Sequence, residues 1–293
     1  MSHAEDPLAL HRGRLLGLAY RMLGSRSEAE DVLQDAWLRF SEVAPGTVRN
    51  EEAFLVTTVT RLCLDRLKSA RAKREIYVGP WLPEPVFDSE ALSPGRTGEL
   101  ADDLSFALLL TLQRLSGAER AAFLLHDVFG ASFAEIAETL GRSEAACRQL
   151  AARARKAVTA ERSGRRPPLE QHRVLLERFV AAAASGDKSG LEALLAADAV
   201  AISDGGGVKR AALRPIRGAD RVARLVTGLL AKAAARGHAL AFEPATVNGE
   251  PALLFYLDGV LDETLSIAVE DGRITALYVV RNPDKLRSAR SLH

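Results

Sequence analysis

Arginines gather in one short stretch of the chain, "GRSEAACRQLAARARKAV", which spans residues 141–158. Arginine is a fixed cation that binds phosphates and reads guanine edges in the major groove of DNA. Apolar residues recur at helical spacing at Cys147, Ala151, Ala154 and Val158, which predicts a helix buried along that stripe. The residues that could contact DNA lie at its start or on its open face: Ser143, Glu144, Arg148, Gln149, Ala152 and Arg153. A solvated basic helix would fit the same pattern, so the rest of the chain has to decide.

The segments before this helix favour a DNA-binding arrangement. Ser132 and Glu135 have capping-box spacing at the start of "FAEIAETL", and Ser116 and Glu119 have it one helix earlier. Gly141 then breaks the pattern between two short helices. This spacing is typical of a helix-turn-helix motif, whose second helix lies in the major groove.

A second basic segment lies far upstream. The stretch "EEAFLVTTVTRLCLDRLKSARAKRE", residues 51–75, reads as a helix that becomes strongly basic toward its end. Its candidate DNA contacts are Arg61, Asp65, Arg66, Arg71 and Arg74, and the loop before it adds Arg49 and Asn50. Phe54 is an aromatic at helical spacing, for which core packing is the favoured reading. Two basic helices joined by an extended segment suit a protein that grips two separated DNA elements.

An acidic face precedes this helix. In "SEAEDVLQDAWLRFSEV" the apolar stripe is Val32, Ala36 and Phe40. Four residues lie off the stripe and are expected to be exposed: Glu30, Asp31, Gln34 and Asp35. Phosphates would repel such a face, so it requires a basic protein partner. Contacts to DNA at two places and to a protein at a third are the layout of a transcription-initiation factor.

The composition changes twice along the chain. Residues 77–100 carry four prolines and the apolar pair Trp81 and Leu82, which indicates a linker without regular structure. After residue 171 come helices and then strand-like runs separated by Asn-Gly and Asp-Gly turns, which is an α+β pattern. The stretch "SDGGGVK" follows the first of these strands.

The bulk composition excludes several classes of protein. The formal net charge is only +1, so any DNA-binding surface must come from local segregation of charge. Without an apolar run of about 18 residues the chain is not expected to contact a membrane, and its first residues do not resemble a signal peptide. The two cysteines predict neither a disulfide framework nor a metal cluster. We therefore expect a cytoplasmic protein without metal or cofactor.

The motifs together resemble a known family. "LLGLAYRMLGSRSEAEDVLQDAWLRF" is similar to region 2 of the bacterial sigma-70 superfamily, and residues 112–158 are similar to region 4. No region 3 intervenes, as in the extracytoplasmic-function group. "GPWLPEP", "SDGGGVK" and "RNPDKL" resemble one subgroup, whose members carry a SnoaL-like domain after region 4.

This resemblance implies a multidomain fold, with two all-α parts followed by an α+β, cone-shaped domain. The implied boundaries are region 2 at 1–78, a linker at 79–100, region 4 at 101–162, the SnoaL-like domain at 169–281 and a tail at 282–293.

The resemblance also implies roles for the residues singled out above. The acidic face would bind the clamp coiled coil of core RNA polymerase. The helix at 51–75 and its preceding loop would recognise and help to melt the minus-ten element of promoter DNA, and the helix after Ser143 would read the minus-thirty-five element. Contacts between the linker and the last domain would fall at Trp81, Leu82, Asp204, Lys209, Asn282, Pro283 and Asp284.

Several alternatives remain open at this point. The chain could be an ordinary helix-turn-helix repressor that acts without polymerase. The last domain could bind a small apolar ligand, or act as a cyclase or isomerase, although the sequence offers no obvious catalytic His–Asp pair and His172 and His238 read as surface residues. Asp204 could simply bond its own backbone in a turn, and Trp81 could pack on the helices next to it.

Overall fold

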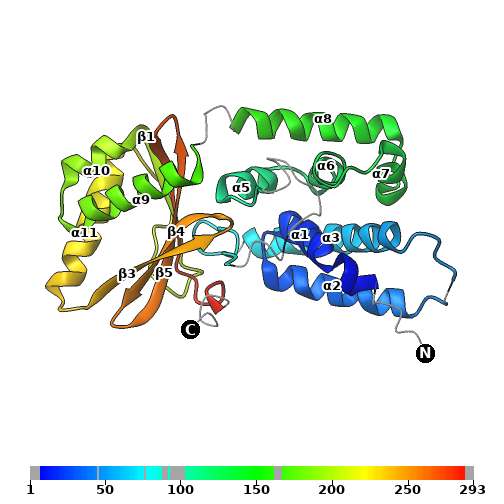
Figure 1. Ribbon diagram of the computed structural model, residues 1–293, viewed down its shortest axis with the longest axis horizontal. Helices are drawn as coiled ribbons and strands as arrows, with labels where there is room; N and C mark the ends of the chain where they lie inside the picture. Colours follow the sequence, from blue (N-terminus) through cyan, green and yellow to red (C-terminus); the bar gives the residue numbers. More distant parts are fainter. Residues whose placement is uncertain are drawn as a thin grey trace. The chain divides into compact units, whose positions relative to one another are not determined.

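The computed structural model describes residues 7–44, 46–75, 77–87, 92, 103–161 and 167–287. The chain divides into two compact units (Figure 1). The helical unit contains residues 1–75 and 88–161, and the C-terminal unit contains residues 76–87 and 162–293. Residues 77–87 of the predicted linker therefore belong with the C-terminal unit.

Three helices form the first part of the helical unit. They are α1 (Pro7–Leu23), α2 (Arg26–Ser41) and α3 (Glu51–Glu75). Ser25 caps α2 by accepting a hydrogen bond from the amide of Glu28, and Gly24 before it has a positive φ of 74° that ends α1. Leu15 of α1, Val32 of α2 and Leu55 of α3 are fully buried, so the three helices share one core.

The second part of the helical unit carries the predicted helix-turn-helix. Its elements are α5 (Phe106–Arg114), α6 (Gly117–Phe123), the short π-helix η2 (Leu124–Val128), α7 (Phe133–Leu140) and α8 (Glu144–Glu161). Ser116 with Glu119 and Ser132 with Glu135 form complete capping boxes, as their spacing predicted. Gly141 ends α7 in the left-handed conformation, so the chain can turn into α8.

The C-terminal unit is an α+β domain. Helices α9 (Leu169–Ala184), α10 (Lys188–Leu194) and α11 (Ala219–Ala235) lie on one face of a sheet (Figure 1). The strands are β1 (Leu195–Asp204), β2 (Ile216–Arg217), β3 (Leu240–Val247), β4 (Glu250–Leu257), β5 (Val260–Glu270) and β6 (Arg273–Val280). Their order is β2-β1-β6-β5-β4-β3, and only β1 and β6 are parallel. The predicted fold class is confirmed.

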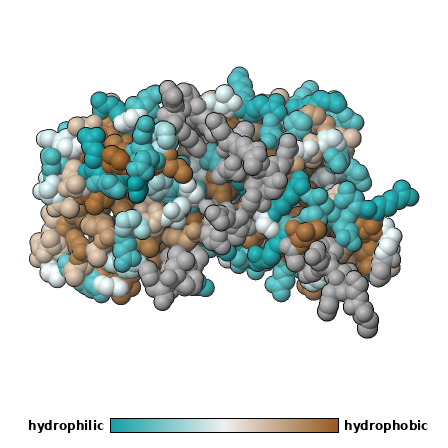
Figure 2. Space-filling view, in the orientation of Figure 1, coloured by the Kyte–Doolittle hydropathy of each residue, from teal (hydrophilic) through white to brown (hydrophobic). Residues whose placement is uncertain are grey.

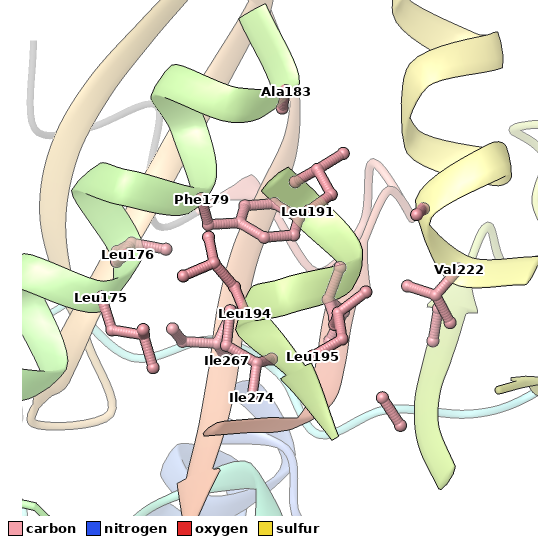
Figure 3. Packing of buried hydrophobic residues seen from close by; sticks show 14 of the residues in the cluster. Leu175, Leu176, Phe179, Ala183, Leu191, Leu194, Leu195, Val222, Ile267 and Ile274 are labelled. Atoms are coloured by element: carbon pink, nitrogen blue, oxygen red, sulfur yellow. The ribbon is translucent and has the colours of Figure 1, made fainter. Parts of the chain in front are cut away.

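The core of this domain fills the space between helices and sheet. Figure 3 shows Phe179 of α9 and Leu191 of α10 among side chains from the strands, with Val222 of α11 beside them. The hairpins that connect β3 to β6 turn at Asn248, Asp258 and Asp271, each with a positive φ and each followed by glycine. These are the Asn-Gly and Asp-Gly turns that the sequence indicated.

The structure corrects two expectations and adds one element. His172 is 4% exposed, because it lies on the buried face of α9 rather than on the surface. The segment after β6 is not a fraying tail over residues 282–287, because Asn282, Lys285 and Leu286 are buried; residues 288–293 lie outside the described part. The short strand β2 was not predicted. Within the described residues, no helix is both long and apolar enough to cross a bilayer.

Candidate functional sites

Helix α8 has the orientation that its apolar spacing predicted. Cys147, Ala151 and Ala154 are fully buried, and the opposite face is open. The exposed positions include all six residues assigned to the minus-thirty-five element: Ser143, Glu144, Arg148, Gln149, Ala152 and Arg153. The helix therefore presents a polar surface next to small side chains, which would allow close approach of DNA.

Four of these exposed residues, Ser143, Glu144, Arg148 and Arg153, already have partners in the protein. Ser143 accepts a hydrogen bond from the amide of Ala146 and so caps α8. Arg148 pairs with Glu144 at 2.5 Å and lies over the ring of Phe133 at 5.4 Å. Arg153 binds Glu119 at 2.7 Å, and the hydrogen bonds of Glu119 to Ser116 and Arg153 lower the pKa of that carboxyl. Both arginines would have to exchange an acidic partner for DNA: Arg148 the exposed Glu144, and Arg153 the half-buried Glu119.

Helix α3 makes hydrogen bonds to helix α7 that its sequence did not suggest. Arg61 donates hydrogen bonds to the carbonyls of Thr139 at 3.0 Å and Glu138 at 2.9 Å, at the end of α7. The hydroxyls of Thr57 and Thr139 lie 3.1 Å apart. A residue assigned to the minus-ten element thus joins the two parts of the helical unit to each other. Nothing in the basic pattern of α3 signalled this contact.

The acidic face carries its own counter-ions. Arg66 of α3 contacts Asp35 at 2.7 Å and Asp31 at 3.4 Å, and Arg26 pairs with Glu30 at 3.2 Å. Burial opposes the charge of Arg66, but its hydrogen bonds to Asp35 and Asp31 outweigh burial and raise its pKa. Two groups that the sequence assigned to different partners, polymerase and DNA, therefore form one ion-pair cluster. Gln34 is exposed beside it.

The remaining minus-ten residues lie in different surroundings. Asn50 caps α3 by accepting from the amide of Ala53 at 3.0 Å, and Arg49 beside it is exposed. Asp65 pairs with Lys68 at 2.8 Å. Arg71 and Arg74 lie in α3, but their side chains are outside the described part of the structure.

Asp204, at the end of β1, is the centre of the linker contacts. Its side chain is fully buried and accepts hydrogen bonds from the amide of Leu82 at 2.9 Å and the hydroxyl of Tyr77 at 2.6 Å. Lys285 neutralises it at 2.7 Å and also donates to the carbonyl of Leu82 at 2.5 Å. The amide of Gly206 donates to the same carboxylate, so Asp204 stabilises both the turn that follows β1 and the contact with the linker.

The rest of the linker follows the same surface. Trp81 lies with its ring 3.9 Å from the ammonium of Lys285. Asn248 joins Val86 by two hydrogen bonds, since its amide donates to the Val86 carbonyl at 2.7 Å and its side chain accepts from the Val86 amide at 2.8 Å. Asn282 donates to Tyr77 at 2.9 Å. We call this set of contacts between residues 77–86 and the C-terminal domain the linker dock.

Two residues grouped with the linker contacts have other roles. Lys209 pairs with Asp262 at 2.8 Å, and Asp284 pairs with Arg287 and donates its amide to Asn282. Pro283, which lies between Asn282 and Asp284 in the chain, is half-buried. Tyr77 and Asn248 were missed by sequence reasoning, and the only available signal was that Asn248 belongs to an Asn-Gly turn. Burial and the hydrogen bond to Asp204 raise the pKa of Tyr77.

The C-terminal domain contains one exposed His–Asp pair among its described residues, and His238 lies near the surface as expected. His238 Nδ1 lies 2.7 Å from Asp258 Oδ2, across the hairpin between β3 and β4. Their side chains are 37% and 54% exposed, so the pair lies at the surface. No group of three or more potential metal ligands occurs among the described residues.

Comparison with known proteins gives a consistent result. A sigma-70 region 2 model matches residues 8–73, and a sigma-70 region 4 model matches residues 105–158. The chain is 43% identical over 288 residues to the ECF RNA polymerase sigma factor SigJ of Mycobacterium tuberculosis, covering 94% of this chain and 90% of SigJ. It is 33% identical to the probable ECF sigma factor SigI of the same species, covering 96% and 94%. The crystal structure of SigJ superposes with a TM-score of 0.77 over 96% of this chain and 97% of that one.

Proposed function

The chain belongs to the extracytoplasmic-function RNA polymerase sigma factors, and we propose that its linker dock regulates how it engages a promoter. As a sigma factor it binds core RNA polymerase and directs promoter recognition. What we add is the assignment of surfaces within this chain. The observation that carries the regulatory proposal is the fully buried Asp204, which binds linker residues from two directions.

The acidic face of α2 is the polymerase-binding surface in this proposal. Asp31 and Asp35 are partly exposed and lie beside Gln34, on the side of α2 away from the buried Val32. Charge reversal would set a cation against Arg66, so the milder double substitution Asp31→Asn with Asp35→Asn is the cleaner test. Asp198→Asn in the C-terminal domain is the control. Loss of core binding in the double variant alone supports the assignment, and equal binding of both variants contradicts it.

The two DNA-reading surfaces are α3 for the minus-ten element and α8 for the minus-thirty-five element. These elements are separated by roughly 25 base pairs, or about 85 Å at about 3.4 Å per base pair. Helix α8 has 18 residues and spans about 27 Å. Because Arg61 bonds the end of α7, the helical unit in this arrangement holds the two readers too close together. Promoter binding therefore requires the contact between α3 and α7 to open.

The linker dock controls this opening through the length of free chain. Residues 77–86 are held by Asp204, Lys285 and Asn248, so only the chain after them remains to separate the two parts. Undocking would release about ten residues, or roughly 30 Å of extended chain. The C-terminal domain would thereby determine the reach between the two DNA-binding surfaces.

The test is run-off transcription with core polymerase on a promoter that the full chain recognises. The proteins compared are the full chain, residues 1–165, Trp81→Ala and the control Val260→Ala, which shortens an exposed apolar side chain of β5 outside the dock. Trp81→Ala and the truncation should change transcript yield, and the control should not. Equal yields from all four would contradict regulation by the dock. Specific binding of the chain to duplex promoter DNA, with no transcript when core polymerase is added, would point to the repressor alternative.

We also propose that the C-terminal domain acts without chemical turnover. The exposed His238–Asp258 pair is not a buried base, and the carboxylate of Glu263 is already paired with Arg281. Purified full chain incubated with hydrophobic aromatic ketones should return them unchanged by chromatography. A product that forms with the wild-type chain and is lost on Glu263→Gln would contradict this part of the proposal and identify an enzyme.

A further inference from the structure

The C-terminal domain contains a large apolar cavity. It has a volume of about 620 Å³ and lies between the sheet and helices α9 and α11. Small-molecule sites in proteins typically have about 300–1,000 Å³ and are mostly apolar with a few polar groups. Residues that line it include Phe179, Val226, Leu230, Phe242, Phe255 and Leu265. Figure 2 shows apolar surface on the left of the view, over the part of this domain where α9, α11 and β3 lie.

The strand register explains why the cavity wall is apolar. Ser203, Val279, Leu265 and Leu253 are successive cross-strand partners on β1, β6, β5 and β4. Side chains of such partners project from the same face of a sheet, so these four form one continuous row. All of them border the cavity.

A second row brings polar groups into the same wall. Phe242, Phe255 and Glu263 are cross-strand partners on β3, β4 and β5, and the two phenyl rings lie 4.9 Å apart. Between the pairs Phe255–Glu263 and Tyr256–Leu261, β5 has one extra residue, Asp262. This bulge lets Asp262 and Glu263, although adjacent in sequence, both border the cavity.

These acids belong to a compact charged cluster. Asp262 is 5% exposed and pairs with Lys209 and Arg281, while Arg281 Nε lies 3.0 Å from Glu263 Oε2. Burial opposes ionisation of Asp262, but hydrogen bonds from Lys209 and Arg281 outweigh it and lower its pKa. Burial raises the pKa of Glu263 to about 7, against the attraction of Arg281. The cluster is thus close to electrical balance.

One donor in this cluster has no acceptor in good geometry. The buried Nε–H of Arg281 makes no hydrogen bond to any described residue, although Glu263 lies within ion-pair distance. A buried donor without an acceptor has lost its hydrogen bonds to water and gained none in return, which disfavours the folded state. An oxygen atom entering the cavity beside Arg281 would remove that cost.

We propose that this cavity binds an uncharged, largely apolar small molecule whose carbonyl oxygen accepts a hydrogen bond from Arg281 Nε. Beside Arg281 an anion would face Asp262 and Glu263 and a cation would face the guanidinium, so the group that binds there is expected to be neutral. The apolar rows select an aromatic or alicyclic skeleton. This binding site is separate from the promoter-binding surfaces and does not depend on their assignment.

The location of the site is tested with 6-propionyl-2-dimethylaminonaphthalene, a neutral fluorescent ketone whose emission reports on polarity. It is titrated into the full chain and into two variants of α11. Ala233→Trp fills the cavity, which Ala233 borders, and the control Ala234→Trp places the same bulk on the exposed side of the helix. Binding should weaken at least tenfold in the first variant and stay unchanged in the second. No saturable binding to the full chain, or equal binding to both variants, would overturn the proposal.

The role of Arg281 is tested with a matched pair of ligands. Arg281→Lys keeps a cation near Asp262 but removes Nε. The ketone should lose about 3–10-fold in affinity, as expected for one hydrogen bond, while the analogue with a propyl chain in place of the propionyl group should lose less than twofold. Equal losses for the two compounds would mean that no hydrogen bond to the carbonyl forms. Circular dichroism checks that each variant folds, and the α11 pair tests the site independently if Arg281→Lys does not fold.

Discussion

Substitution of Asp204 by Asn perturbs the linker dock with little change of shape. The carboxylate accepts hydrogen bonds from Leu82, Tyr77 and Gly206 and pairs with Lys285. An amide of the same size has one acceptor oxygen and presents two N–H donors instead of the second. At least one N–H of the new amide must therefore face one of the protein groups that donated to the carboxylate. The negative charge that paired with Lys285 is also lost. The dock should therefore weaken even if the C-terminal domain keeps its fold.

The magnitude follows from burial. The Asp204 side chain is 0% exposed and that of Lys285 is 10% exposed. Removing one member of a buried ion pair costs about 3–5 kcal/mol, because the other charge stays uncompensated. The rings of Trp81 and Tyr77 lie 3.9 Å and 5.3 Å from the Lys285 ammonium and offset part of that cost. We expect about 3 kcal/mol, which lowers the ratio of docked to undocked linker by roughly 150-fold.

Hydrogen exchange at the amide of Val86 measures this equilibrium without direct interference. That amide bonds to Asn248, which the substitution does not touch. Its exchange in the full chain should become about 100-fold faster in Asp204→Asn. Asp271→Asn is the control, because Asp271 lies in an exposed turn with a φ of 49° that Asn also adopts.

A second variant makes the reasoning refutable. Lys285→Met removes the ammonium that Asp204→Asn leaves without a counter-ion, and it keeps most of the apolar part of the side chain. The Val86 amide should therefore exchange more slowly in the double variant than in Asp204→Asn alone. Simple additivity of the two single effects would show that the pair is not coupled. An exchange rate at Val86 that stays within threefold of wild type in Asp204→Asn would refute the dock as described.

Three further predictions concern other surfaces. Arg148→Ala should reduce discrimination among minus-thirty-five sequences by about 1–3 kcal/mol if the guanidinium reads guanine, measured as relative affinity on a panel of promoters; a uniform loss would indicate phosphate contact instead. Arg61→Ala should open the helical unit, seen as a larger radius of gyration of the full chain by X-ray scattering, whereas an unchanged radius would mean that these hydrogen bonds do not hold it closed. Glu263→Gln should flatten the pH dependence of unfolding. The pKa of Glu263 is raised to about 7 in the folded state. The stability that this shift contributes is fully present below the unfolded pKa of about 4.5 and is lost as pH rises through 7. In urea titrations from pH 5 to pH 8 the wild type should therefore lose stability relative to the variant, and a constant difference in unfolding free energy would rule out this titration.

Local sequence signals predicted the helix-turn-helix well, because short-range physics determines it. The capping boxes at Ser116 and Ser132 satisfy amides within three residues, and Gly141 takes a left-handed conformation that other residues resist. The buried stripe on α8 follows from its period alone. The same holds for the hairpins, whose turn residues sit between alternating strands.

Contacts between distant segments could not be read in the same way. Asn282 bonds Tyr77 across 205 positions, and Arg61 bonds Thr139 across 78. An arginine on an exposed helix face can donate hydrogen bonds equally well to a phosphate or to the free backbone carbonyls at the C-terminus of another helix, since both offer acceptor oxygens. The pattern of α3 therefore indicated a basic surface correctly but did not identify what occupies it. Glu263 was missed because an acidic residue in a strand becomes meaningful only when the register places it at a cavity.

The cavity and the linker dock meet at one short stretch of chain after β6. The backbone amides of Arg281 and Asn282 both donate to the carbonyl of Asp204, at 2.7 Å and 2.9 Å. The side chain of Arg281 borders the cavity, whereas that of Asn282 bonds Tyr77 in the linker. A molecule that draws the Arg281 guanidinium toward the cavity would move the residue next to Asn282, which bonds the linker. Coupling between sites requires only that each biases the same two-state element. If the linker dock opens as proposed above, the docked and undocked linker are those two states, and Arg281 is the residue through which a cavity ligand would reach them.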